Sequence, residues 1–209
     1  MNILNQLASS QGRNDQVLNI HLAQDIANNK DKDAVAELVL LLEHKNKTIQ
    51  SDAIKTLYEI GEIVPELLIP YIQNFVQLLD SKNNRLVWGV MTTLKTITHL
   101  CTKEIFNLLD KLEKVSNLGS VITRDNYVSI LITLGQNAIQ KSEIVQRLCK
   151  QLENCPSNQL PMYAEHSLAI IDQSNKVAFI HILKNRIPEI DKESKKKRIE
   201  KILHKLNKL

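Results

Sequence analysis

The chain has 209 residues, of which 43% are hydrophobic and 24% are charged, and its formal net charge is +4. A chain of this length buries roughly 70% of its unfolded surface in one domain, so its core needs no metal ion or disulfide bond for stability. Five glycines, five prolines and an aromatic content of 4% exclude a sheet-rich or collagen-like chain and predict an all-α fold with short turns.

The positive charge is concentrated at the C-terminal end. Residues 191–209 contain eight basic and three acidic residues, a net charge of +5, so the preceding residues carry a net charge of −1. A nearly neutral body argues against a protein that clamps DNA along its whole length. The basic stretch keeps apolar residues at helical spacing, which predicts a capping helix with a basic outer face.

The cysteines and the apolar runs favour a cytoplasmic protein. Cys101, Cys149 and Cys155 cannot all pair within one chain, and no two of them have CxxC spacing. No run of about 18 apolar residues is long enough to cross a membrane, and the first residues lack the pattern of a signal peptide. We therefore expect a reducing compartment and no membrane insertion.

Apolar residues at a spacing of 3.6 predict about six helix pairs. In chain order the pairs are expected at residues 1–29, 31–62, 65–100, 102–139, 141–172 and 175–208. They are grouped into one domain, 1–209, with an N-terminal cap pair (1–30), core repeats (31–173) and a C-terminal cap pair ending in the basic helix (174–209).

The helix pairs repeat every 37 residues. KNKTIQSDAIKTLYEI at 45–60 is followed one period later by KNNRLVWGVMTTLKTI at 82–97. One helix pair cannot bury both of its apolar faces, so neighbouring pairs must stack and share a core. The repeat aligns four leucines that we expect in this core: Leu57, Leu94, Leu131 and Leu168.

Glycine and proline mark the expected ends and bends of helices. Gly61 and Gly135 lie two periods apart, and we expect each to end a helix in the left-handed backbone conformation that glycine favours. Pro70 falls within the first turns of its helix and is expected to bend it.

The repeated units resemble HEAT or armadillo-type repeats, most closely in LLEHKNKTIQSDAIKTLYEIG (41–61) and LLDSKNNRLVWGVMTTLKTIT (78–98). The resemblance implies a right-handed α-α superhelix, a HEAT-like solenoid of about six stacked helix pairs. It also implies a concave groove, lined by the second helix of each pair, that holds a partner.

One feature of HEAT repeats is largely missing. Such repeats often carry an Asp in the turn between the two helices and an Arg early in the second helix, and together these form an ionic ladder. Asn46 and Asn83 stand near the first position, and Gln50, Val87 and Arg124 stand at the second. Only Arg124 matches, so a complete ionic ladder is not expected.

Motifs of catalysis and ligand binding are absent from the sequence. It has no phosphate-binding GxxxxGK[ST] loop, no GxGxxG, no HExxH and no GxSxG. The six histidines are scattered, and Cys149 and Cys155 are expected to be buried as small apolar residues. We therefore expect no catalytic residues, no cofactor and no metal site.

Trp88 is the main candidate for partner binding. It is the only tryptophan, and the repeat places it where neighbouring units have Ser51 and Asp125, so it does not fill a repeated core position. Its ring either covers a seam between units or anchors a partner, as interface tryptophans often do. The candidate partner-binding residues on the outer faces of the second helices are Tyr58, Arg85, Trp88, Thr92, Lys95, Arg124 and Asp125.

Three functions remain open. The repeats and the missing catalytic motifs favour a non-enzymatic scaffold that binds a protein or peptide. The alternative is nucleic-acid binding through the basic last helix, at Lys195, Lys196, Lys197 and Arg198. A remote third function is that of the HEAT-like DNA glycosylases, but Thr92 rather than a carboxylate follows Trp88 by one turn, and Asp125 belongs to the next unit.

Overall fold

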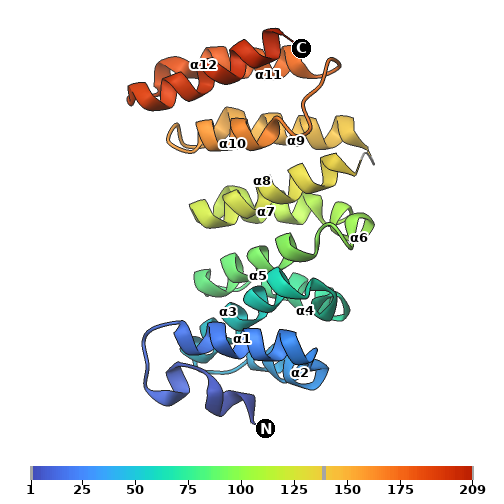
Figure 1. The fold of residues 1–209 in the computed structure, drawn as a ribbon, viewed down its shortest axis with the longest axis vertical. Helices are drawn as coiled ribbons and strands as arrows, with labels where there is room; N and C mark the ends of the chain where they lie inside the picture. The colour runs from blue at the N-terminus through green and yellow to red at the C-terminus, as the bar shows by residue number, and fades with distance from the viewer. Residues whose placement is uncertain (1, 138–139, 209) are drawn as a thin grey trace. The chain divides into compact units, whose positions relative to one another are not determined.

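The structure is a computed structural model that describes residues 2–137 and 140–208 (Figure 1). Within these residues every regular element is a helix, which confirms the predicted all-α fold. The α-helices are α1 (Val17–Asn29), α2 (Lys32–Leu41), α3 (Lys47–Ile63), α4 (Ile72–Leu78), α5 (Asn84–Ile97), α6 (Thr102–Phe106), α7 (Leu109–Leu118), α8 (Val121–Gln136), α9 (Lys141–Asn154), α10 (Leu160–Ser167), α11 (Lys176–Arg186) and α12 (Glu193–Asn207). Short 3-10 helices in the same ranges are η1 (Ile3–Gln6), η2 (Ser9–Gln11), η3 (Pro65–Tyr71) and η4 (Ile187–Glu189).

The chain divides into two compact units, Met1–Tyr127 and Val128–Leu209, and the division falls inside α8. In the first unit α3 packs between α1 and α5, while α2 packs on α3 and α4 packs on α5. In the second unit α9 packs on α10 and α11, and α12 packs on the same two helices. The grouping of the whole chain into one domain stays a prediction.

The predicted core register holds for three of the four repeated leucines. Leu57, Leu94 and Leu131 are completely buried, on α3, α5 and α8. Leu168 is only half-buried, so its assignment to the core was wrong. The reason is that α10 ends at Ser167, and Leu168 therefore falls in the turn that follows the helix.

In two of the helix pairs, the first helix is divided into two shorter helices. The predicted helix that contains Pro70 begins as the 3-10 helix η3 and becomes the α-helix α4 only at Ile72, so the segment is divided close to Pro70, and the predicted bend stays a prediction. Proline lacks the N–H that an α-helical hydrogen bond needs, which favours the tighter turn before it. The first helix of the next pair is likewise divided, into α6 and α7.

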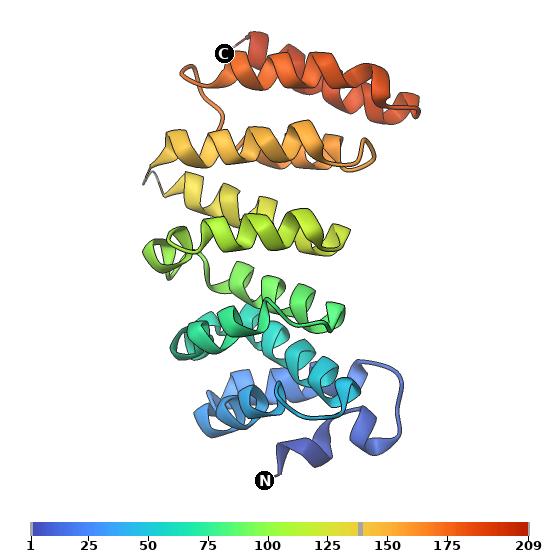
Figure 2. The same cartoon turned by 180° about the vertical axis from the view of Figure 1, so that it is seen from behind.

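Of the expected N-terminal helix pair, the second helix is formed as α1, but the first is not an α-helix. Residues 3–11 form η1 and η2 instead of an α-helix, at the end of the first unit marked N (Figures 1 and 2), where η1 packs on α2 and η2 packs on α3. Main-chain N–H groups of the segment donate to carboxylates of the repeats: Ile3 to Glu37 at 2.8 Å, and Ser9 to the buried Asp52 at 2.8 Å. Two short helices expose more backbone donors than one helix does, and the carboxylates satisfy them.

Gly61 and Gly135 do not end helices in the left-handed conformation, so that prediction was wrong. Gly61 lies inside α3 and Gly135 inside α8, and the only positive φ angles in the described chain belong to Gly12, Lys30 and Gln140. The glycines instead permit close packing. A Cβ atom at Gly61 would lie 2.2 Å from the Thr96 hydroxyl oxygen, far below contact distance.

The turns before α3 and α5 are joined by amide side chains rather than by ion pairs. Asn46 and Asn83 cap these helices, where their side-chain oxygens accept hydrogen bonds from the N–H groups of Thr48 and Arg85. The Asn83 amide also donates to the Gln50 side-chain oxygen at 2.9 Å. A neutral amide contact therefore stands where HEAT repeats often have an Asp and Arg ladder.

Ion pairs connect equivalent helices one period apart. In the first unit Lys95 on α5 binds Glu62 on α3 at 2.7 Å. In the second unit Arg198 on α12 binds Glu165 on α10 through two hydrogen bonds of 2.7 and 2.5 Å. These contacts lie at the surface, so the buried apolar residues contribute most of the stability.

Gly89 on α5 gives a direct test of the close packing. A Cβ atom at Gly89 would lie 2.6 Å from Cγ1 of Ile54, so Gly89→Ala should lower the free energy of unfolding by about 1–2 kcal/mol despite the better helix propensity of alanine. Ile54→Ala alone should cost about 2–5 kcal/mol, and the double variant should cost clearly less than the sum, because it removes the clashing atoms. Urea denaturation measures all three.

The matched control combines Ile54→Ala with Gly135→Ala. Gly135 faces Ile170 rather than Ile54, so the two costs should add. Additive costs for Gly89 and Ile54 as well would show that the two residues do not limit the approach of α3 and α5.

The pair of Glu165 and Arg198 predicts how stability depends on pH. Hydrogen bonds from the Arg198 guanidinium hold the pKa of Glu165 below its ordinary value of 4.5. The pair therefore stabilises the fold above pH 4.5, and this contribution is lost as the pH falls through the lowered pKa of the folded state. Denaturant midpoints should fall less between pH 7 and pH 3 in Glu165→Gln than in the wild type. If the denaturant midpoint falls equally between pH 7 and pH 3 in Glu165→Gln and in the exposed control Glu200→Gln, the pair of Glu165 and Arg198 is not the cause of the pH dependence.

Candidate functional site

A hollow of about 290 Å³ opens on the first unit between α3, α5 and the segment that precedes α1. It contains three of the residues predicted from the sequence: Tyr58, Arg85 and Trp88. The residues that line it are Asn14, Gln16, Ser51, Ile54, Lys55, Tyr58, Arg85 and Trp88. We call this site the Tyr58–Trp88 hollow.

Helical spacing brings the lining residues together. Ser51, Lys55 and Tyr58 follow one another at four and three residues on α3, and Arg85 and Trp88 are three residues apart on α5. Residues at these spacings share one face of a helix. The two faces meet because α3 and α5 pack directly against each other.

The aromatic rings of Tyr58 and Trp88 are neighbours across the two helices. Their ring centroids are 6.0 Å apart and the planes are tilted by 48°. Both residues are half-buried, so each ring is partly packed and partly exposed to solvent. The two interpretations of Trp88 are therefore compatible: its ring covers the seam between α3 and α5 and also lines the hollow.

Lys55 adds a positive charge beside the rings. Its ammonium group lies 4.8 Å from the Tyr58 ring centroid and forms an ion pair with Glu59. Burial alone would lower the pKa of Lys55, but the Glu59 carboxylate and the Tyr58 phenol outweigh it, so the pKa is raised and the group stays charged. Burial raises the pKa of the Tyr58 phenol, which keeps this group neutral.

Arg85 and the indole of Trp88 provide open hydrogen-bond donors. Arg85 is exposed, and its guanidinium has no hydrogen bond or ion pair with any residue in the described ranges. The indole N–H of Trp88 likewise has no acceptor among the described residues. Two donor groups at the hollow are therefore free to bind a ligand.

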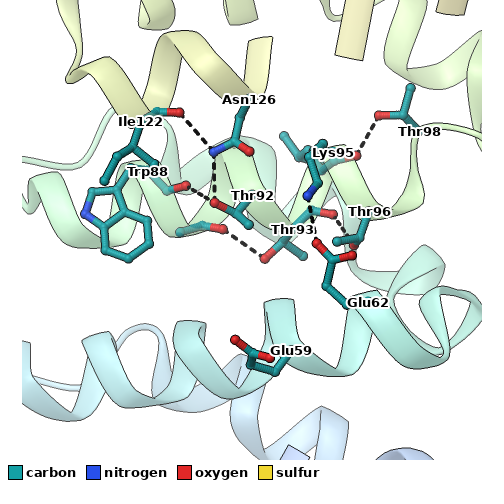
Figure 3. A network of polar contacts seen from close by, with 12 residues as sticks. Glu59, Glu62, Trp88, Thr92, Thr93, Lys95, Thr96, Thr98, Ile122 and Asn126 are labelled. Atoms are coloured by element: carbon teal, nitrogen blue, oxygen red, sulfur yellow. Dashed lines mark hydrogen bonds and ion pairs between the residues drawn. The ribbon is translucent and has the colours of Figure 1, made fainter. Parts of the chain in front are cut away.

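Thr92 and Lys95 connect helices and do not line the hollow. The Thr92 hydroxyl donates to the Trp88 carbonyl at 2.9 Å and accepts from the Asn126 amide of α8 at 2.9 Å (Figure 3). Lys95 binds Glu62 of α3 in the same view, while the Trp88 indole points away from this network. These contacts hold the helix that carries Trp88 in place.

Arg124 and Asp125 are also outside the hollow. Both lie near the start of α8, are half-buried and have contacts within the chain, but neither lines the space beside Trp88. The structure thus brings together three of the seven predicted residues and assigns Thr92 and Lys95 to the surrounding helix contacts.

Sequence reasoning missed the contribution of the segment before α1. Asn14 and Gln16 form one wall of the hollow, and the Gln16 amide contacts Asp52 at 3.4 Å. No periodic pattern in the segment predicts where it folds. The position of Lys55 in the sequence could have identified it as a lining residue, because it lies three residues before Tyr58 and one period before Thr92, on the outer face of its helix.

Two of the four basic residues proposed for nucleic-acid binding have partners within the second unit. Lys195 donates to the main-chain and side-chain oxygens of Asn158, both at 3.0 Å, and Arg198 binds Glu165. Lys196 and Lys197 have no such partner in the described part of the chain. The basic face of α12 is therefore smaller than its sequence indicates.

The cysteines are free thiols in protected positions. Cys101 and Cys155 are buried, and Arg186 approaches the Cys155 sulfur at 3.4 Å. Cys149 is half-buried, less than expected, and burial raises its pKa to about 11. No three His, Cys, Asp or Glu side chains within residues 2–137 and 140–208 are grouped as metal ligands would be.

Comparisons with known proteins identify similar folds without a function. No protein-family model matches the chain. A stretch of 121 residues is 32% identical to the uncharacterised protein L294 of Acanthamoeba polyphaga mimivirus, and this match covers 54% of the chain but 4% of the viral protein. The chain thus spans a small fraction of that relative.

Two engineered proteins with crystal structures from the Northeast Structural Genomics Consortium are similar in fold. One matches with a TM-score of 0.63 and 19% identity, over 100% of this chain and 98% of its own. The other has a TM-score of 0.62 and 17% identity, with both chains covered completely. Among the described helices, none has the length and apolar character needed to span a bilayer.

The raised pKa of Cys149 predicts slow alkylation. At pH 7 a thiol with a pKa of about 11 has about 100-fold less thiolate than one at the ordinary value of 9.0, and the thiolate is the reactive form. Iodoacetamide should therefore modify Cys149 about 100-fold more slowly in the native protein than in urea. Mass spectrometry of the Cys149 peptide measures both rates, and equal rates would contradict the protected environment.

Proposed function

We propose that this protein is a non-enzymatic scaffold that binds a protein or peptide partner through the outer faces of its second helices, with the Tyr58–Trp88 hollow as the main contact. The observation that carries this proposal is the pair of half-buried rings beside two open donors, Arg85 and the Trp88 indole. Aromatic residues and arginines at the edge of a hollow are the side chains that contribute most to binding in protein interfaces.

The size of the hollow supports a peptide partner. Pockets for small molecules and cofactors measure about 300–1,000 Å³, and this hollow of about 290 Å³ lies at the lower limit. It is large enough for one or two side chains of a partner. The resemblance to HEAT or armadillo-type repeats agrees with this proposal, because the second helices of such repeats hold partners in a concave groove.

The contacts of the last helix favour a protein partner over nucleic acid. Lys195 and Arg198 are bound to Asn158 and Glu165, so they are less available to phosphate groups. Phosphate recognition depends on the number of free cations that a surface offers. A cytoplasmic location belongs to the same proposal, since the free thiols of Cys101, Cys149 and Cys155 fit a reducing compartment.

Co-purification from the cells that encode the chain tests the scaffold proposal. Proteins that co-purify with the wild type should be lost, by at least about 10-fold in quantitative mass spectrometry, with Trp88→Ala, because truncation of an interface tryptophan costs at least about 2 kcal/mol. Val177→Ala, at an exposed apolar residue of the second unit, is the control and should retain them. Circular dichroism checks that both variants fold.

Two outcomes would contradict the proposal. Identical partner sets with wild type and Trp88→Ala would remove the hollow from the interface. Partners that disappear on nuclease treatment and with Lys196→Glu plus Lys197→Glu, but not with Trp88→Ala, would favour the nucleic-acid alternative.

A further inference from the structure

We infer that the Tyr58–Trp88 hollow recognises an acidic side chain presented next to an apolar one in an extended peptide segment of the partner. This inference rests on the proposed function and adds the chemistry of the partner to it. It depends on the positive charge of Arg85, on the apolar residues of the lining and on the open polar groups of Trp88 and Asn14.

The lining is positively charged. Lys55 and Arg85 are the charged residues that line the hollow, and no aspartate or glutamate is among the lining residues. Lys55 stays charged, but the Glu59 carboxylate offsets its charge, which leaves Arg85 as the open cation. A guanidinium binds a carboxylate through two parallel hydrogen bonds, so an Asp or Glu of the partner fits this position better than any other side chain.

The floor of the hollow is apolar. Ile54 is 1% exposed and lines the hollow together with the rings of Tyr58 and Trp88. An apolar side chain of the partner can pack on these rings and exclude water from the neighbouring carboxylate. Exclusion of water strengthens the contact between the carboxylate and Arg85, because the local dielectric constant falls.

The polar edge fits the main chain of an extended segment. The Trp88 indole N–H donates, and the Asn14 amide has both a donor and an acceptor; neither side chain has a partner within the described residues. An extended segment exposes its N–H and C=O groups to such partners, whereas a helical segment has already paired them. A segment of two or three residues with an acidic residue beside an apolar one therefore satisfies the whole site.

Selection from a displayed library of random 12-residue peptides on the full chain tests this inference. Peptides enriched on the wild type should carry Asp or Glu next to Leu, Phe or Trp. Measured by fluorescence anisotropy, their affinity should fall about 10-fold or more with Arg85→Gln, because a charge-assisted contact is lost, and with Trp88→Ala. Arg85→Glu should instead select peptides with Lys or Arg at the acidic position.

The matched control is Lys150→Glu, which makes the same change in net charge at an exposed lysine of α9 in the second unit. It should retain the affinity of the wild type for the selected peptides. An equal loss with Lys150→Glu and Arg85→Glu would show that the effect comes from net charge alone, and it would overturn the inference.

The remaining outcomes separate this inference from the scaffold proposal. Peptides that require Trp88 but show no acidic preference would overturn the acidic partner and leave the scaffold proposal intact. Two results would overturn both the acidic partner and the role of the hollow. In the first, the selected peptides bind the wild type and Trp88→Ala with equal affinity. In the second, selection on the wild type enriches no peptides beyond those enriched on Trp88→Ala.

Discussion

The close approach of α3 and α5 is the constraint on which the first unit depends. Gly89 leaves space for Ile54, and Gly61 leaves space for Thr96, so at these two positions no Cβ atom holds the helices apart. Core side chains such as Leu57 and Leu94 are then completely buried, as the dense packing of protein interiors requires. The same approach brings the outer faces of α3 and α5 together, and the hollow forms where those faces meet.

Polar contacts give this apolar core a defined register. Gln50 to Asn83, Thr92 to Asn126 and Lys95 to Glu62 each connect residues 33 or 34 positions apart, close to the period of the repeat. Each contact contributes little free energy at the surface, but a shift of one helix along its neighbour would break several of them together. Burial therefore supplies the stability of the unit, and the amides and ion pairs fix how equivalent helices align.

The sequence predicts repeated features better than unique ones. The period of 37 residues predicts the helices and the burial of Leu57, Leu94 and Leu131, because each position is supported by its equivalents. It fails for Leu168, which follows the early end of α10, and for Gly61, which looks like a helix end but is a packing site. In the hollow, Tyr58, Arg85 and Trp88 could be predicted from helix faces. The wall formed by Asn14 could not, because its position depends on hydrogen bonds over long sequence distances.

The segment that forms this wall is held by main-chain hydrogen bonds, by buried side chains such as Leu7 and by the Gln16 amide. Ile3 and Ser9 donate their backbone N–H groups to Glu37 and Asp52, and every amino acid except proline has such a donor. The anchoring carboxylates belong to the helices, so they remain in place whatever side chains the segment carries. Substitutions at exposed positions of this stretch, such as Asn14, can therefore reshape one side of the hollow while the buried side chains and the main-chain contacts stay in place. Sequence variation at the exposed residues next to Asn14 would therefore change the outline of the hollow and leave the packing of α3 on α5 as it is.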